Sequence, residues 1–469
     1  MEAQNKLYDF IIIGCGPTGS TAATYLSKMG YSVLVFEKSK FPRAHEGESL
    51  LPFCYSMFQD LGVWEEMKTK FVRKPGARFS SHDGSNSSTW CFKSVIFDES
   101  YLSFNVFRPQ FDLMLMNNAR KNGVTVLEET KVEAVKLDRP DRIVEVDTVD
   151  KMGMKAHWEG KFLIDATGQD TFLAKRIGSK NAYKELDRIA FLAHWKGGNF
   201  KHGLDVGLIN IVYLEKGKRG WFALQPVGKD LMSIALIVER KYLKEQKKIF
   251  TEQGVADWQK EFYMKEIWEC EVTKEVLMGG MMDHDLMVIS DYSYFSDKWY
   301  GDNFALLGDA YKFLDPIFST GVYLGMKSAQ MFAEAMHVKL TSDQETGDKK
   351  LAETFETISG GYNLVEQFID IFYDPNSFNL AEVSSKSESV YHGYEAAFAM
   401  VHLLLAGDFF TNYKKYHDFL AMLKDPVQYG RWKNFIVSVP HFDEATCGTN
   451  PGEVFGAIVE EFKMDMPIS

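Results

Sequence analysis

Cysteine is scarce in this chain and forms no pattern typical of metal binding or redox exchange. The 469 residues include five cysteines, which are widely separated and contain no Cys-x-x-Cys pair. Zinc sites and thioredoxin-like motifs need such closely spaced pairs. The odd number and the scatter favour reduced thiols, as expected in a cytoplasm. We therefore predict a cytoplasmic protein with reduced cysteines and no metal site.

Long apolar runs and an excess of positive charge are also missing. The longest apolar run, Ala396 to Ala406, is interrupted by His402 and is too short to span a bilayer. The chain runs almost at once into a strand pattern, which indicates no signal peptide. A net charge of −12 disfavours nucleic acid and anionic membranes as partners. We expect no nucleic-acid binding and no membrane span.

A glycine-rich motif occurs once, within residues 9–38. An apolar strand pattern leads into Gly14, Gly16 and Gly19, a helix pattern follows, and a second strand ends at Glu37. The three glycines permit a tight turn, a close approach of the backbone to a pyrophosphate, and close packing of helix on strand. Helix N–H groups face the phosphates, and the acid accepts ribose hydroxyls. The motif predicts a dinucleotide site, and the absence of a second copy disfavours an additional NAD(P)H domain.

Two later segments suit the flavin half of such a dinucleotide. Asp309 follows the buried-strand pattern Asn303–Leu307 and is placed to accept a ribityl or ribose hydroxyl; the alternative is a helix cap. Ser319-Thr320-Gly321 opens a helix pattern whose N–H groups suit the pyrimidine edge of a flavin. The sequence thus predicts three separated segments around one flavin dinucleotide.

The order of these patterns predicts an α/β fold. A Rossmann-like FAD-binding domain is followed by an antiparallel-sheet substrate domain and a helical C-terminal region. The sheet is predicted from the β-rich runs Gly207–Tyr213, Trp221–Leu224 and Leu231–Val238, which Gly-containing turns separate. We place the FAD-binding domain at 1–180 and 290–337, the substrate-side sheet domain at 181–289, and the helical cap at 338–469. Aromatic residues between 409 and 419 are interpreted as core rather than substrate cage.

Five segments together resemble the flavin-dependent halogenases, the tryptophan and phenol halogenase-like branch of the FAD-dependent aromatic-hydroxylase-type superfamily. The resemblance extends over about residues 8–335. The segments are GCGPTGS, FPRAHEGESLLP, RPQFD, DATG and GDAYKFLDPIFSTGVYLGM. FLDPIFSTG and the lysine of FVRKPG, Lys74, are especially similar to that family.

The resemblance implies an activity and a set of site residues. Reduced FAD, supplied by a separate flavin reductase, reacts with oxygen and a halide ion (chloride, bromide or iodide) to give hypohalous acid. Lys74 at the end of a tunnel then delivers the halogen to an electron-rich aromatic substrate, either free or bound to a carrier protein. The implied halide ligands are Thr320 and Gly321. The implied FAD contacts are Gly14, Gly16, Thr18, Gly19, Glu37, Lys38, Ser49, Arg108, Val132, Asp309, Gly321 and Val322.

The sequence departs from the family pattern at one place and leaves alternatives open. Halogenases commonly carry Trp-x-Trp-x-Ile-Pro on the substrate sheet, where this chain has Ala223 and Gln225 at the second Trp and the Ile. Smaller side chains there favour direct oxygen transfer, so a flavin monooxygenase of aromatic or polyketide-like substrates is the alternative. An isoprenoid reductase of the same superfamily is a third. Lys74 could also be a surface lysine beside a turn, and Arg108 a member of a surface salt bridge.

Overall fold

The glycine-rich motif lies in a seven-stranded sheet with the order β7-β2-β1-β10-β9-β8, and β19 pairs with β10. In this sheet β7, β2, β1, β10 and β19 run parallel to their neighbours. Strand β9 is the exception, because it pairs antiparallel with both β10 and β8. A computed structural model describes residues 6–215, 217–374, 380, 395–425, 427, 443 and 445–458. The strands are β1 (Leu7–Ile13), β2 (Val33–Phe36), β7 (Thr125–Leu127), β8 (Thr130–Lys136), β9 (Val144–Asp150), β10 (Lys155–Asp165) and β19 (Phe304–Leu306).

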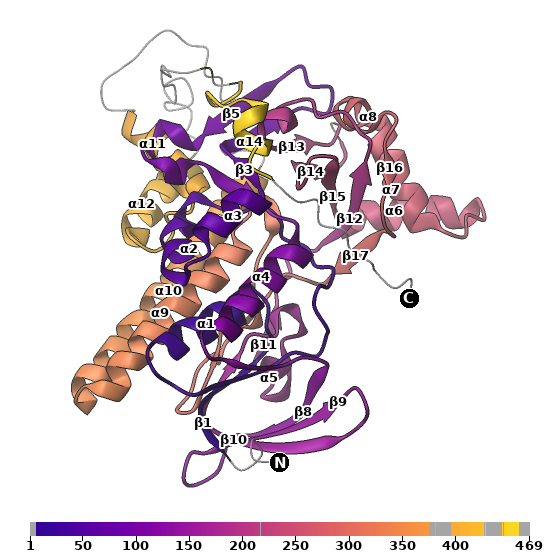
Figure 1. The fold of residues 1–469 in the computed structure, drawn as a ribbon. Coiled ribbons are helices and arrows are strands. Elements are labelled where there is room, and N and C mark those ends of the chain that lie inside the picture. The colour runs from indigo at the N-terminus through magenta and orange to yellow at the C-terminus, as the bar shows by residue number, and fades with distance from the viewer. Residues whose placement is uncertain are drawn as a thin grey trace.

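Helices cover this sheet because its central strands are apolar on both faces. Ile11, Leu34 and Ile164 are completely buried, as is typical of parallel strands. Two long helices, α9 and α10, run side by side, and α1 packs against α9 (Figure 1). The helices around this sheet are α1 (Pro17–Lys28), α2 (Tyr55–Leu61), α3 (Trp64–Lys70), α4 (Arg108–Lys121), α5 (Phe172–Arg176), α9 (Gly321–Thr341) and α10 (Gln344–Tyr373).

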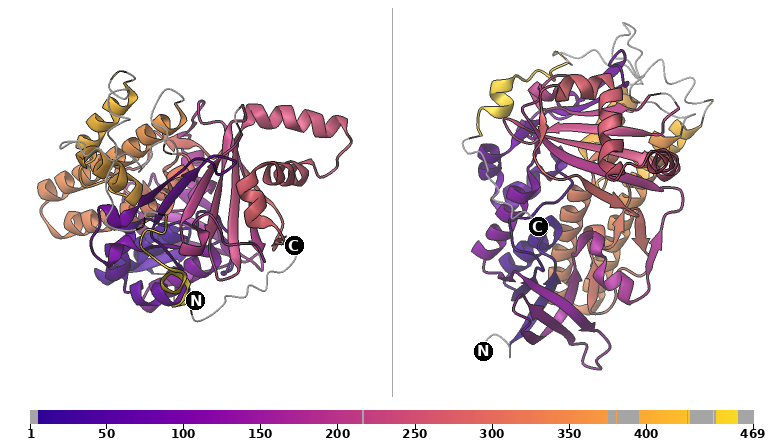
Figure 2. Two further views of the ribbon diagram at one scale, coloured as in Figure 1. Left: turned by 90° about the horizontal axis from the view of Figure 1, so that it is seen from above. Right: turned by 90° about the vertical axis from the view of Figure 1, so that its right-hand side faces the viewer.

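A second, eight-stranded sheet has the order β16-β12-β15-β14-β13-β4-β5, with β17 paired to β12. It is antiparallel except for the parallel pair β13 and β4. Three helices cover one face, and they project away from the first sheet (Figure 2). The elements are β4 (Gly76–Ser80), β5 (Ser87–Cys91), β12 (Arg188–Lys196), β13 (Ile209–Tyr213), β14 (Gly220–Pro226), β15 (Leu231–Glu239), β16 (Met281–Met282), β17 (Met287–Ser290), α6 (Arg240–Glu252), α7 (Trp258–Glu269) and α8 (Glu271–Leu277).

Small sheets and C-terminal helices complete the described chain. One small sheet pairs β3 with β6, and the other has the order β11-β18-β20. The remaining elements are β3 (Val72–Lys74), β6 (Ser103–Asn105), β11 (Lys180–Ala182), β18 (Tyr294–Ser296), β20 (Lys312–Phe313), α11 (Glu395–Ala406), α12 (Tyr413–Lys424) and α14 (Pro451–Phe455). Much of the predicted cap at 338–469 lies outside the described residues.

The predicted fold class is confirmed, and the differences concern boundaries. The polar stretch 341–350 is mostly helix, because only Ser342 and Asp343 separate α9 from α10. Asp343 caps α10 by accepting a hydrogen bond from the Thr346 N–H, which explains why so polar a stretch interrupts the helices so briefly. The aromatic residues between 409 and 419 are mainly core, since Phe409, Phe410, Tyr416 and Phe419 are buried.

The prediction of reduced cysteines is wrong for two of the five. Cys91, at the end of β5, forms a disulfide with Cys447, and 356 positions separate them. The other three are free and buried. The bond attaches the segment that carries α14 to the second sheet, and Val454 of this segment packs on Val72 of β3 in the separate small sheet. No spacing rule reveals a pairing across so much of the chain.

Within the described ranges, no helix is both long enough and apolar enough to cross a lipid bilayer. The longest, α10, has charged residues throughout its first half.

We predict that reduction of the Cys91–Cys447 disulfide lowers thermal stability. A cross-link that closes so long a loop restricts the unfolded chain, and its loss costs about 2–4 kcal/mol. Differential scanning calorimetry with and without a phosphine reductant measures the change in Tm. The double variant Cys91→Ala/Cys447→Ala is the control, because its Tm should not respond to the reductant. An unchanged wild-type Tm after mass spectrometry confirms reduction would contradict the prediction.

Candidate functional site

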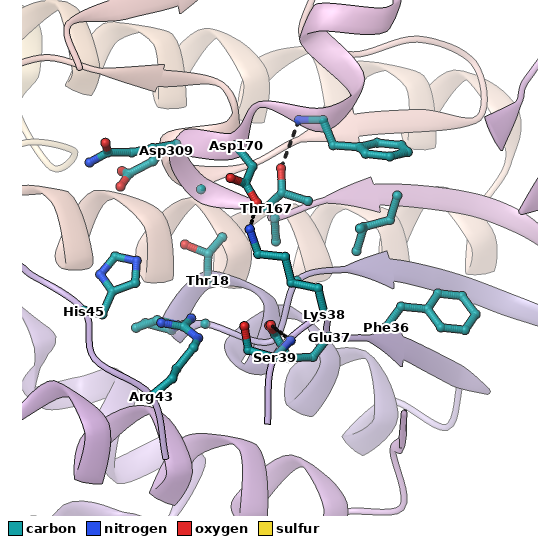
Figure 3. A pocket seen from close by; sticks show the side chains of 18 of the residues that line it. Thr18, Phe36, Glu37, Lys38, Ser39, Arg43, His45, Thr167, Asp170 and Asp309 are labelled. Atoms are coloured by element: carbon teal, nitrogen blue, oxygen red, sulfur yellow. Dashed lines mark hydrogen bonds and ion pairs between the residues drawn. The ribbon is translucent and has the colours of Figure 1, made fainter. Parts of the chain in front are cut away.

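A cavity of about 680 Å³ lies at the carboxyl ends of β1, β2 and β10. Ligands of open α/β sheets bind at this edge, where the loops that follow the strands converge. The walls come from the glycine-rich turn, the loop after β2, the segment after β10 and the start of α9. Figure 3 shows that side chains from these separate segments point into one space.

Close backbone contacts explain two of the three motif glycines. Gly14 has φ +96°, and a Cβ there would lie 2.4 Å from the Ala166 carbonyl oxygen. A Cβ on Gly19 would lie 2.0 Å from the Gly14 carbonyl oxygen, so α1 packs directly on the turn. Gly16 faces open space, with only the Arg43 guanidinium near its Cβ position, at 3.5 Å. The first N–H groups of α1 have no side-chain cap and adjoin the cavity.

Glu37 ends β2 with a buried carboxylate that the backbone holds in place. Its two oxygens accept hydrogen bonds from the N–H groups of Cys15 and Ser39, each at 2.9 Å. The next residue, Lys38, forms an ion pair with Asp170 across the cavity (Figure 3). The acid at the end of β2 thus has a fixed position in the cavity wall, as a ribose ligand requires.

Most of the sequence-predicted cofactor residues line this cavity or its neighbour. Gly19 packs beneath the turn instead. Ser49 and Thr320 line a second cavity, described below. The predicted cofactor residues that line the first cavity are Gly14, Gly16, Thr18, Glu37, Lys38, Arg108, Val132, Asp309, Gly321 and Val322.

Arg108 begins α4 as a buried cation. Its guanidinium donates to both carboxylate oxygens of Asp112, at 2.7 and 2.9 Å, and also to the Glu46 carbonyl. Burial opposes both charges, yet this pairing holds the pKa of Asp112 below its ordinary value. A surface salt bridge, the alternative considered above, is wrong because both side chains are buried. The pair fixes the 45–49 segment against the flavin side of the cavity.

Asp309 is half-buried and lines both cavities. Burial, with a smaller contribution from the nearby Glu46 carboxylate, raises the pKa of Asp309 to about 7. The helix-cap alternative receives no support, because neither carboxylate oxygen accepts a bond from the described backbone. A half-buried carboxyl with no ion-pair partner among the described residues is suited to hydrogen bonding with ligand hydroxyls.

A second cavity, of about 140 Å³, adjoins the first and reaches the second sheet. Arg108, Asp309, Gly321 and Val322 line both cavities. One wall is the start of α9, where Ser319 has φ +56° and Thr320 leaves the first helical N–H groups without a side-chain cap. Free N–H groups at a helix start attract anions.

The opposite wall of the second cavity is the uncovered face of β12, β14 and β15. Trp221 donates to the Tyr373 hydroxyl at 2.8 Å, and that hydroxyl lies 3.1 Å from both oxygens of Asp315. Asp315 accepts from the Ile317 N–H at 3.1 Å. This chain of contacts ties the sheet to the FLDPIFSTG loop through the end of α10.

Lys74 is buried in β3, with 1% of its surface exposed, so the surface-lysine alternative is wrong. Its amine donates to the Leu50 carbonyl at 3.0 Å and lies 5.4 Å from the centre of the Phe92 ring. Burial lowers the pKa of Lys74 to about 7. The amine lines neither cavity. Its hydrogen-bond acceptor, Leu50, directly follows Ser49, which is one of the residues that line the second cavity.

Sequence reasoning missed several lining residues. Arg43, Gln169 and Asp170 line the first cavity, and Lys312 and Asp315 line the second. The DATG segment and FLDPIFSTG contained the available signal, because each directly precedes or includes some of these positions. The positive charge of Arg43, close to the glycine-rich turn, was the clearest sequence signal for these missed lining residues.

The sequence similarity of this chain to known proteins agrees with the geometry of the dinucleotide cavity. Residues 8–358 match the family model of the FAD binding domain. The chain is 32% identical over 337 residues to the 1H-pyrrole-2-carbonyl-(peptidyl-carrier protein) brominase of Pseudoalteromonas luteoviolacea, covering 71% of this chain and 77% of that enzyme. This chain belongs to the flavin-dependent halogenase family.

Two further halogenases are similar to this chain, one in sequence and one in fold. The chain is 30% identical over 331 residues to the tryptophan 2-halogenase of Chondromyces crocatus, covering 70% of this chain but only 60% of that enzyme. The fold of the myxobacterial chondrochloren halogenase CndH matches with a TM-score of 0.71 at 26% identity, covering 97% of this chain and 98% of that one. Fold similarity to a halogenase thus spans almost the whole chain.

FAD is the cofactor of this halogenase family member, and the residues present fit it. The glycine turn has the close contacts and open N–H groups that a pyrophosphate needs. Glu37 has the position of a ribose ligand, and the cavity continues to the start of α9. The carboxyl of Asp309 lies between the two halves, where it lines both cavities.

We predict that Gly14→Ala weakens FAD binding by at least about tenfold. The added Cβ meets a backbone carbonyl that cannot move without displacing the segment after β10. Gly30→Ala is a matched control, because Gly30 has a similar φ of +91° but no atom within 4 Å of its Cβ position. FAD fluorescence titration measures both affinities. Equal effects of the two substitutions would show that backbone strain, rather than the contact in the cradle, matters.

Proposed function

We propose that the protein is a halogenase that uses reduced FAD, oxygen and a halide ion to halogenate an electron-rich aromatic substrate. The observation that carries this proposal is the buried, weakly basic amine of Lys74 behind the wall of the second cavity. A lysine with such a pKa is rare, and it has no carboxylate partner among the described residues to justify burial.

The start of α9 is the proposed halide site. Thr320 and Gly321 line the second cavity, and the helix N-terminus offers uncapped N–H groups to an anion. When bound, reduced FAD supplies the two electrons that activate oxygen, from which halide yields hypohalous acid. Apolar side chains of the sheet line the second cavity and limit the access of water to the acid formed there.

Lys74 transfers the halogen in two balanced steps. Its neutral amine attacks the halogen of hypohalous acid, so a nitrogen–halogen bond forms, the halogen–oxygen bond breaks, and water leaves. The arene then takes the halogen, loses a ring proton, and restores the amine. Because only the neutral amine has a lone pair, the low pKa of Lys74 is what makes this route available near pH 7. Direct hydrogen bonding of the acid by the charged amine is the other route, and the pH experiment below separates them.

We also propose that a separate flavin reductase supplies the reduced cofactor. The chain has one dinucleotide motif, and the FAD binding domain match accounts for it. NADH with FAD and the purified protein alone should therefore give no halogenated product, whereas adding any flavin reductase should. The relative from Pseudoalteromonas acts on a pyrrole group held by a carrier protein, so carrier-bound arenes belong in the substrate panel beside free phenols, indoles and pyrroles.

Hydroxylation is the second candidate function. Ala223 and Gln225 both line the second cavity, where the halogenase pattern has bulky groups. Their small or flexible side chains leave room for an arene beside the flavin. Product mass distinguishes the two functions, because halogenation depends on halide and hydroxylation adds one oxygen in its absence.

We predict that Lys74→Met abolishes halogenation and leaves FAD binding and oxygen consumption unchanged. Methionine fills a similar volume but has no amine. Lys70→Met is the matched control, because Lys70 precedes the same strand but pairs with Glu66 on the surface. Product formation by mass spectrometry and oxygen uptake by electrode are the measurements. Normal halogenation by the Lys74 variant would exclude the assigned role.

We predict that halogenation rises with pH and levels off above about 7. The pKa of Lys74 lies near 7, so the neutral fraction of its amine falls about tenfold per pH unit well below that value. Oxygen consumption, which does not use Lys74, is the internal reference at each pH. The ratio of product to oxygen should follow the same curve with chloride and bromide. A ratio that rises as the pH falls would favour hydrogen bonding by the charged amine.

A further inference from the structure

The cavity face of the second sheet changes from apolar to polar along the strands. Register aligns three rows across β12, β15 and β14, and alternation places all three on the face away from α6–α8. The first two rows consist of apolar residues and the third of polar residues. In order, they are Ala190–Ile237–Trp221, Leu192–Ala235–Ala223 and His194–Ser233–Gln225.

The polar row contains buried atoms without hydrogen-bond partners. Among the described residues, the Gln225 Oε1 and Ser233 Oγ atoms have none, although both side chains are more than nine-tenths buried. Gln225 lines the second cavity. An unpaired buried polar atom is unfavourable, so these atoms call for a hydrogen-bonding partner such as a bound ligand.

Glu48 extends the polar row from the facing loop. Its Oε1 atom lies 2.8 Å from the His194 Nε2 atom, while its Oε2 atom is buried and has no partner among the described residues. Burial opposes a charge on His194, but the carboxylate of Glu48 raises the pKa of the imidazole above its ordinary value. Glu48 also lines the second cavity. An ionised carboxylate oxygen only accepts hydrogen bonds, so its partner must be a donor.

The charge of the cavity also disfavours an anionic substrate. Four acidic side chains line it, against Arg108 and Lys312. Arg108 pairs with Asp112, and the Lys312 amine lies 2.6 Å from a carboxylate oxygen of Glu366. Within the described lining, neither cation is left for a carboxylate on the substrate. The halide site at the start of α9 uses backbone N–H groups and lies across the cavity from the sheet.

We propose that Gln225, Ser233 and Glu48 form a polar subsite that selects arenes bearing a hydroxyl or N–H group over their methylated and carboxylated analogues. The arene lies on the small apolar residues of the neighbouring row, and its donor group points to the polar row. This inference rests on the proposed function, because it assigns the substrate class of the same cavity. Gln225, at a position where the family pattern has isoleucine, is its specificity-determining residue.

Binding to the FAD-loaded protein tests the subsite independently of halogenation. The probes are 4-propylphenol, 4-propylanisole and 4-propylbenzoate, which share a ring and a chain and differ in one group. Flavin absorbance titration under air, without reductant, measures their Kd values. We expect the phenol to bind at least about tenfold more tightly than the ether or the carboxylate, since a site built around a donor rejects analogues that lack it. Equal affinities for phenol and ether would overturn the proposal.

Single substitutions test which residues of the subsite cause the preference for phenol over ether. Gln225→Leu and Ser233→Ala should each reduce the preference for phenol over ether at least about threefold, chiefly by weakening phenol binding. Ser80→Ala is the matched control, because Ser80 is a buried serine of the same sheet that donates to Asn210 and lies outside the cavity. It should leave the preference unchanged. Loss of FAD affinity in Gln225→Leu would instead assign the row to the flavin and overturn the proposal.

Turnover distinguishes failure of this inference from failure of the proposed function. Selective phenol binding together with hydroxylated, never halogenated, product would reject halogenation but keep the subsite. Halogenation of phenol and ether with equal KM would keep the proposed function and reject the subsite. In Gln225→Leu we expect the KM for phenol to rise at least about threefold, whereas Ser80→Ala should keep the KM of the unchanged protein.

Discussion

The desolvation of one primary amine is the constraint on which this account depends. Lys74 lies in β3, whose pairing with β6 places the side chain inward, and one carbonyl, that of Leu50, is its hydrogen-bond acceptor. Burial in such surroundings disfavours the ammonium form more strongly than one neutral acceptor compensates. Burial therefore lowers the pKa of Lys74 to about 7, and the proposed halogen transfer uses the neutral form of the amine. A salt bridge at this position would stabilise the charge and remove that reactivity.

The arrangement of the two sheets brings the dinucleotide cavity and the proposed arene site next to each other. Parallel strands converge on the dinucleotide cavity, and the loop 45–49 and the start of α9 continue it to the face of the second sheet. Hydrogen bonds and a buried ion pair hold these parts together. Trp221, Tyr373 and Asp315 connect the sheet to the α9 loop, and Arg108 with Asp112 anchors the 45–49 segment. The Trp221–Tyr373 contact and the bond from Arg108 to the Glu46 carbonyl each join segments that are distant in sequence, so the site depends on tertiary packing.

Sequence predicted the parts of the site whose chemistry is local. The turn from Gly14 to Glu37 was predicted because its contacts lie within one strand–helix–strand unit. The burial of Lys74 agrees with the role that family resemblance implied, whereas spacing alone favoured a surface lysine. The Cys91–Cys447 bond and the ion pair of Lys38 with Asp170 were missed, because distant segments create both. The polar row through Gln225 requires strand register, which the sequence does not specify.

The most direct test of the central claim is an NMR titration of the lysine side chains in FAD-loaded protein. Lysine labelled with ¹³C at Cε reports the charge of each amine, and Lys74→Met assigns the signal by its disappearance. The account predicts one buried lysine that titrates near pH 7. A Lys74 signal that remains charged up to about pH 10, the ordinary range for lysine, would contradict it.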